Sequence, residues 1–152
     1  QYFPNKDAIL VRLYENHFHL VKQMVSGVLE DFKDRSLSIA AVIKGIFTRA
    51  IDLQKTNPRL FRVVNLAPQV RSLMETERSH ERIWIDVAAE GLSMRNGKPT
   101  SSNRADALLL VLTTQSVGRW LIHAESGDAE RRLVAEQAVG MLAESLRQRG
   151  CR

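Results

Sequence analysis

The chain has 152 residues, of which 44% are hydrophobic and 26% are charged, and its formal net charge is +5. This length and composition predict one soluble globular domain and argue against a disordered protein. No apolar run approaches the roughly 18 residues that a membrane span requires, so we expect no membrane contact. Lys6 and Asp7 interrupt any apolar start of the kind that signal peptides have.

The charge pattern and the single cysteine bear on nucleic-acid binding and on the location of the protein. The arginines are scattered among Glu and Asp, which indicates solvated helix faces rather than a basic run for nucleic acid. Because Cys151 is the only cysteine, no internal disulfide can form, and this favours a reducing, cytoplasmic location. We expect Cys151 to be a frayed thiol near the C-terminus.

The first expected element is a long helix over residues 5–34. Asn5 can cap it, Lys6 opens it, and Asp7 lies in the first turn, where the helix dipole favours an acid. Such a helix would be about 45 Å long and could carry a signal between two distant regions. Apolar side chains at three- and four-residue steps form its buried face: Leu10, Leu13, Tyr14, His17, Val21, Met24, Val25, Val28 and Phe32.

Two long helices and one short one are expected in the middle of the chain. Ser38 caps a helix that ends at Asn57, a short helical segment covers 58–67, and Pro68 opens a helix that runs to about Leu92. Apolar periodicity predicts the inner faces of the two long helices. These faces are Ile39, Val42, Ile43, Ile46, Phe47, Ala50 and Ile51 in the first, and Val70, Leu73, Met74, Glu77, Glu81, Trp84, Ile85, Ala88 and Leu92 in the second.

The last third of the chain predicts a loop and two helices. Residues 94–102 contain a turn dipeptide and a proline, so they are the most loop-like stretch. Asn103 is expected to cap the next helix, with Asp106 in the capping-box position, and this helix runs to about Glu125. The final helix covers 128–150. The chain therefore predicts an all-α fold, an antiparallel bundle of about six helices.

Residues 2–10 carry a more specific pattern: an aromatic pair, Pro4, Asn5, Lys6, an acid and then aliphatic residues. This order resembles a junction in the tetracycline-repressor (TetR) family of transcription regulators. In that family the segment follows the recognition helix of a helix-turn-helix and opens the long fourth helix. Beyond residue 10 the similarity is one of helix pattern and not of motif.

The resemblance implies a division of the chain and a set of DNA contacts. Residues 1–10 would be the end of a DNA-binding head and the start of the linking helix, with the helix-turn-helix before residue 1. Residues 5–152 would be the effector-binding and dimerisation domain of the TetR type. Tyr2 and Lys6 match residues that contact the DNA backbone, a role that suits a lysine near a helix N-terminus. Operator DNA would then bind through the head.

If the predicted inner faces meet, they enclose a pocket with aromatic side chains and a few polar groups, which suits a small amphipathic ligand. The carboxylate of Glu77 on an apolar face is costly unless it is paired, so it indicates either a structural ion pair or a ligand with a cationic or hydrogen-bond-donating group. The candidate pocket residues are His17, Phe18, Val21, Phe47, Phe61, Glu77, Trp84 and Gln115.

The last two helices have more apolar surface than one small bundle can cover, because residues 107–112 are apolar all round. The resemblance implies that this pair forms a four-helix bundle with its twin across a two-fold axis. The alternative is that both faces complete the core of a single chain. The candidate interface residues of the homodimer are Leu108, Leu112, Arg119, Leu133, Gln137, Gly140, Met141 and Glu144.

The first functional hypothesis is a ligand-responsive transcriptional repressor, in which a small-molecule effector tilts the long first helix and changes the spacing of the two DNA-binding heads. The second is a helical-bundle enzyme or metal protein, because Glu77 and His80 have the spacing of one half of a di-iron site. No second such pair and no nucleophile motif accompanies them, so we expect no enzyme, no metal and no cofactor. The third is an interaction module without a small ligand.

Overall fold

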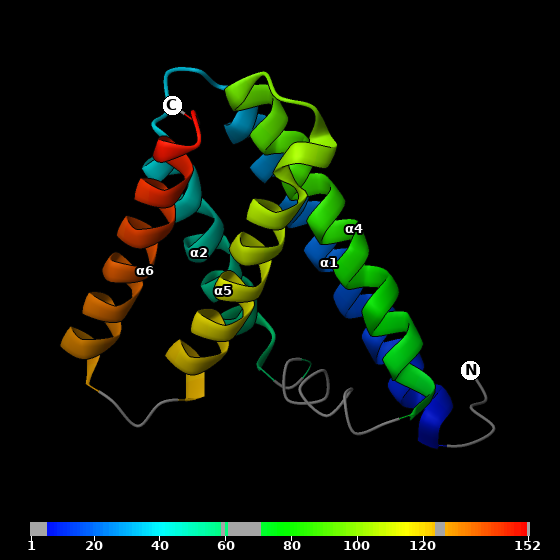
Figure 1. The fold of residues 1–152 in the computed structure, drawn as a ribbon. Helices are drawn as coiled ribbons and strands as arrows, with labels where there is room; N and C mark the ends of the chain where they lie inside the picture. Colours follow the sequence, from blue (N-terminus) through cyan, green and yellow to red (C-terminus); the bar gives the residue numbers. More distant parts are fainter. Residues whose placement is uncertain (1–5, 59, 61–70, 124–126, 152) are drawn as a thin grey trace.

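The computed structural model describes residues 6–58, 60, 71–123 and 127–151, with side chains except at 7, 54, 71–77 and 122–123. Within these ranges the chain forms helices and no strand, so the predicted all-α class is confirmed (Figure 1). The expected short helix over 58–67 falls almost wholly outside the described residues. The helices are α1 (Lys6–Lys33), α2 (Ile39–Thr56), α4 (Arg71–Asn96), the short 3₁₀ helix η2 (Thr100–Asn103), α5 (Arg104–His123) and α6 (Asp128–Gln148).

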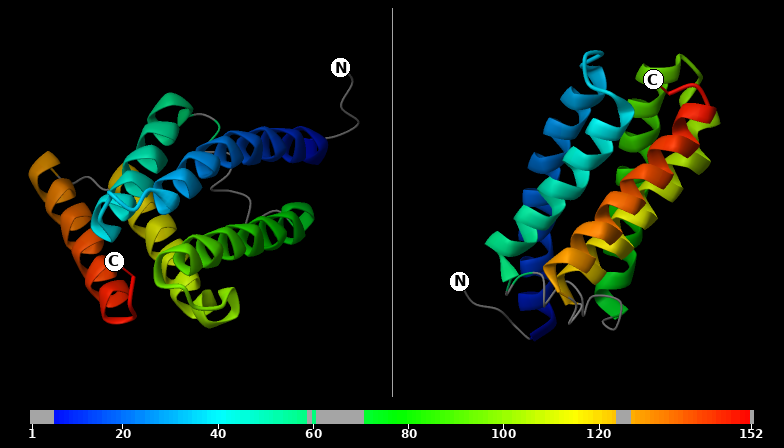
Figure 2. Two further views of the ribbon diagram at one scale, coloured as in Figure 1. Left: turned by 90° about the horizontal axis from the view of Figure 1, so that it is seen from above. Right: turned by 90° about the vertical axis from the view of Figure 1, so that its left-hand side faces the viewer.

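Four of the helices form a ring, in which α1 packs on α2 and α4, and α5 packs on α4 and α2. The fifth helix, α6, packs on α2 and α5, on the side away from α1 and α4 (Figure 2). The α1–α2 turn, the α4–α5 connection and the end of α6 lie at one end of the bundle, and the first turn of α1 lies at the other (Figure 1). In the part of the chain that is described, no helix has the length and apolar character of a membrane span.

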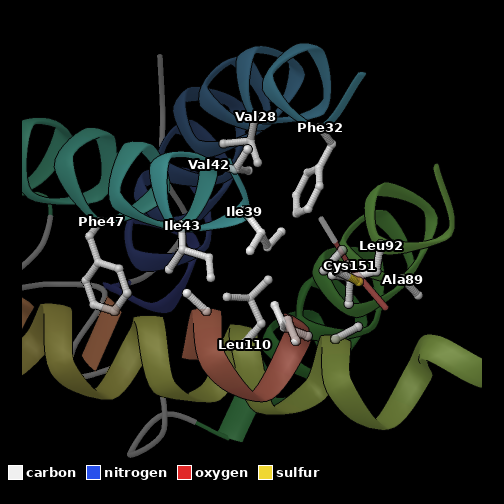
Figure 3. Packing of buried hydrophobic residues seen from close by; sticks show 14 of the residues in the cluster. Val28, Phe32, Ile39, Val42, Ile43, Phe47, Ala89, Leu92, Leu110 and Cys151 are labelled. Atoms are coloured by element: carbon white, nitrogen blue, oxygen red, sulfur yellow. The ribbon is translucent and has the colours of Figure 1, made fainter. Parts of the chain in front are cut away.

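The core is aliphatic and is centred on the inner face of α2 (Figure 3). Ile39, Val42 and Ile43 are almost completely excluded from solvent, and Phe32 and Leu92 approach them from α1 and α4. These residues lie on the faces that the three- and four-residue periodicity predicts. The sequence pattern therefore identifies correctly which side of each of these helices is buried.

Two arginines join the neighbouring C-terminal ends of α1 and α4, two parallel helices (Figure 1). The buried guanidinium of Arg95 donates to the main-chain carbonyls of Asp31, Asp34 and Leu37 at 2.9, 2.8 and 2.7 Å. In return, Arg35 donates to the carbonyl of Arg95 at 2.9 Å. Helix C-termini carry partial negative charge and unpaired carbonyls, so these cations allow the two ends to lie side by side.

Helices α2 and α5 begin directly after Ser38 and Asn103, as predicted, but only Ser38 acts as a cap. Ser38 caps α2 as predicted, since its hydroxyl accepts a hydrogen bond from the amide of Ala41 at 3.2 Å. The buried side chain of Asn103 instead forms a pair of hydrogen bonds with the side chain of Asn96. Asp106, the expected partner in a capping box, forms an ion pair with Arg149 at 3.0 Å. The capping prediction at this helix is therefore wrong, because tertiary partners take both side chains.

The expectation of a frayed Cys151 is also wrong, because this side chain is buried in the core beside Leu92 (Figure 3). Gly150, at φ +94, donates to the carbonyl of Arg147 at 2.9 Å, and Cys151 donates to that of Leu146 at 3.0 Å. This is the Schellman arrangement, in which a glycine in the left-handed region lets the chain fold back over the last helical turn. Burial raises the pKa of the Cys151 thiol.

Gly91 lets α4 approach α1 closely at Phe32. A Cβ at position 91 would lie 2.5 Å from the ring carbon Cδ2 of Phe32, and this ring is fully buried. We expect Gly91→Ala to lower the free energy of unfolding by about 1–2 kcal/mol, because the overpacking outweighs the better helix propensity of alanine. Urea unfolding would test this. The same substitution at Gly27 of α1, where a Cβ would meet only side-chain atoms of Arg49 at 3.7 and 3.9 Å, should raise stability instead.

Candidate functional site

A cavity of about 200 Å³ lies at the centre of the four-helix ring. Every helix of the ring contributes to its wall, and most of the wall is aliphatic. The exposed side chain of Gln115 marks its mouth, and the buried side chains of Val28, Ala88 and Leu110 mark its inner end. The lining residues are His17, Val21, Met24, Val25 and Val28 of α1, Ile46, Ala50 and Leu53 of α2, Trp84, Val87 and Ala88 of α4, and Leu110, Val111, Thr114 and Gln115 of α5.

The cavity brings together four of the eight residues that the sequence analysis places in a pocket: His17, Val21, Trp84 and Gln115. Phe47 does not line it. Its ring is buried in the core at the far end of the α2 row (Figure 3). Phe18 is also absent from the wall. Phe61 and the side chain of Glu77 lie outside the described residues, so the expected carboxylate has no described position.

Phe18 belongs instead to an aromatic stack that joins α1 to α4 beside the cavity. The ring of His80 lies parallel to those of Phe18 and Tyr14, at centroid distances of 3.4 and 5.2 Å. Phe18 also contacts Trp84, at 5.5 Å and a tilt of 55°. His80, which the metal hypothesis pairs with Glu77, is thus packed between two rings. Among the described residues, no group of three or more His, Cys, Asp or Glu could hold a metal ion.

The described wall of the cavity carries no Asp, Glu, Lys or Arg side chain. Its one titratable group is His17, whose pKa is lowered from 6.5 to about 4, mainly because burial disfavours the imidazolium and also because His80 is nearby. The imidazole is therefore neutral at pH 7. The hydroxyl of Thr114 donates a hydrogen bond to the carbonyl of Leu110 at 2.7 Å, which leaves the hydroxyl oxygen as an acceptor.

The second candidate site is the α5–α6 face, which we define as the eight predicted interface residues together with Leu109 and Trp120. All ten are exposed in the single chain. Leu133 and Leu109 are each 54% exposed and Met141 is 75% exposed, so these apolar side chains do not complete the core of one chain. The two helices pack on each other, and both pack on α2 (Figure 1).

The remaining site prediction concerns DNA. Lys6 is exposed at the first residue of α1, at the end of the bundle opposite the C-terminus, and Tyr2 lies outside the described residues.

No model of a known protein family matches this sequence, and a search of curated proteins finds no significantly similar sequence.

Sequence reasoning missed several residues of the cavity wall, among them Leu53, Val87 and Thr114. Others, such as Met24 and Ile46, lie on predicted inner faces without being assigned to the pocket. The apolar periodicity predicts residues such as Met24 and Ile46 only as core positions. It could not have shown where the packing leaves a space, because that depends on how four separate helices fit together.

Proposed function

We propose that this chain is the regulatory domain of a ligand-responsive transcriptional repressor of the TetR type. The proposal is supported by the residue order at 2–10, by the all-helical fold and by the central cavity. The single observation that carries it is the place of that cavity. His17, Val21, Met24, Val25 and Val28 of α1 form one side of its wall.

This placement suits the transmission of a binding signal. α1 has 28 residues and is about 42 Å long, and its first residue, Lys6, lies within the segment 2–10 that resembles the junction to a DNA-binding head. A ligand in the cavity touches α1 and the three other helices of the ring, so it can favour one tilt of α1 over another. It shifts the equilibrium only by the difference in its affinity for the two states.

The α5–α6 face suits a second copy of the chain across a two-fold axis. It combines exposed leucines and methionine with a few polar groups, and Gly140 leaves room for the close approach of a partner helix. A dimer through this face would place two copies of α1 in a fixed relation. Two heads at the N-terminal ends of these helices would then have a defined spacing on DNA.

Met141→Glu is expected to weaken self-association of the chain about tenfold or more, because the interface would have to bury an unpaired carboxylate. Sedimentation equilibrium at micromolar concentration measures this. The matched control is Ile83→Glu, which places the same charge at an exposed isoleucine of α4, outside the α5–α6 face. A monomeric unmodified chain, or equal effects of the two substitutions, would contradict the dimer proposal.

The proposed function is tested with the intact gene product, including whatever precedes Gln1. We expect a helix-turn-helix directly before residue 1 and retardation of a DNA fragment from the region upstream of the gene. We also expect this DNA complex to change when the cavity is filled by substitution, for example in Ala50→Leu. An upstream sequence without a helix-turn-helix, in a protein that retards no DNA, would refute the proposal.

A further inference from the structure

We propose that the central cavity binds an uncharged, compact, mostly apolar molecule, about one substituted six-membered ring in size, that carries a single hydroxyl or similar hydrogen-bonding group. This inference rests on the proposed function in one respect, since it takes the cavity as the effector site. It goes further by assigning the chemical class of the effector.

The size follows from the volume of the cavity. A cavity of about 150 Å³ holds benzene, and sites for drug-sized ligands begin at about 300 Å³. At about 200 Å³, the space among α1, α2, α4 and α5 accepts one ring with a small substituent. A larger ligand would either extend out of the mouth at Gln115 or break the packing of Val28, Ala88 and Leu110 at the inner end.

The absence of charge on the ligand follows from the wall. An ion that enters an apolar site loses its hydration and needs a partner of opposite charge. The described wall offers only aliphatic side chains, an indole, an amide, a hydroxyl and the neutral imidazole of His17. The cationic group that Glu77 suggested forms no part of this proposal, because the side chain of Glu77 lies outside the described residues.

The single polar group follows from the few polar atoms of the wall. The hydroxyl oxygen of Thr114 can accept a hydrogen bond, since its own hydrogen is used within α5. The next residue, Gln115, offers both a donor and an acceptor at the mouth. A hydroxyl group, which donates and accepts, satisfies such a set better than a group that only accepts.

Four small aromatic molecules of similar size separate these properties: p-cresol, toluene, benzoate and benzylamine. Titration calorimetry with the whole chain is expected to show that p-cresol binds about tenfold or more tightly than either ion. Toluene should bind more weakly than p-cresol and more tightly than the ions. Ala50→Leu, which fills the cavity from α2, should abolish the binding of p-cresol. Ala41→Leu, at an exposed position of the same helix, should leave it unchanged.

If Ala50→Leu does not fold, as judged by its circular dichroism, Val111→Phe fills the same cavity from α5. The inference is overturned if none of the four molecules binds, or if p-cresol still binds after the cavity is filled. It is also overturned if either ion binds as tightly as p-cresol and is lost in the filled variant, although the cavity would then remain an effector site. The proposed function itself fails on a separate result, the absence of DNA binding by the intact protein.

Discussion

Replacing Arg95 with methionine is expected to lower the free energy of unfolding by about 3–5 kcal/mol, because it removes a buried cation together with three hydrogen bonds to main-chain carbonyls. Arg95 is only 4% exposed, so water cannot easily replace the guanidinium at those carbonyls. Asp31, Asp34 and Leu37 belong to the end of α1 and the turn that follows it. The substitution should therefore loosen the α1–α4 contact at the end of the bundle opposite Lys6.

Urea unfolding at one fixed protein concentration, followed by circular dichroism, measures this loss. The matched control is Arg104→Met, which removes an exposed ion pair with Asp86 and should cost less than about 1 kcal/mol. Arg95→Lys should recover only part of the stability, since one ammonium group cannot reach three separated carbonyls. Equal stabilities of Arg95→Met and Arg104→Met would show that the α1–α4 ends do not depend on the guanidinium.

The parts of the fold that could be predicted are those that local sequence determines. The apolar repeat of α1 and the cap at Ser38 depend on residues within a few positions of one another, and both predictions hold. The predictions of the buried faces of α2 and α4 are correct for the same reason, as the buried side chains of Ile43 and Leu92 show. Helix period and capping chemistry are properties of short segments, so they need no knowledge of the partners.

The failures lie where distant segments meet. Asn103 and Asp106 have the right spacing for a cap, but Asn96 and Arg149 take their side chains. Cys151 lies next to the end of the chain, yet the core covers it once Gly150 turns the chain back. No local signal distinguishes these outcomes from the expected ones, because each depends on a neighbour that only the assembled bundle supplies.

The same division applies to the candidate sites. His17 and Trp84, both on predicted inner faces, line the cavity, whereas Phe47 fills the core and Phe18 stacks on His80. An aromatic residue on an inner face can either pack or border a cavity, and its sequence context is identical in the two cases. The surplus of apolar positions in α5 and α6 predicts that some of them stay on the surface. The large apolar residues among the eight predicted ones are indeed exposed: Leu108, Leu112, Leu133 and Met141.

The stability of the chain is expected to fall by about 3 kcal/mol between pH 7 and pH 4 on account of His17 alone. The pKa of His17 is about 4 in the folded chain and 6.5 ordinarily, because burial and the neighbouring His80 disfavour the charged ring. The unfolded chain therefore binds a proton in this window that the folded chain does not. The contribution of neutral His17 is fully present above pH 6.5 and is lost as the pH falls toward 4. Burial also lowers the pKa of His80, which acts in the same direction.

Urea unfolding at pH 7, 6, 5 and 4 isolates this effect when the chain is compared with His17→Gln, because the carboxylates titrate alike in both. The variant should lose about 3 kcal/mol less than the unmodified chain over this range, whatever its stability at pH 7. Asn16→Gln, at an exposed residue of α1 that does not titrate, should follow the unmodified chain. Identical pH dependence in all three proteins would mean that the imidazole of His17 takes up its proton as easily in the folded chain as in the unfolded chain. In that case the wall of the cavity would be more polar than its aliphatic lining indicates, and an ionic effector would no longer be disfavoured.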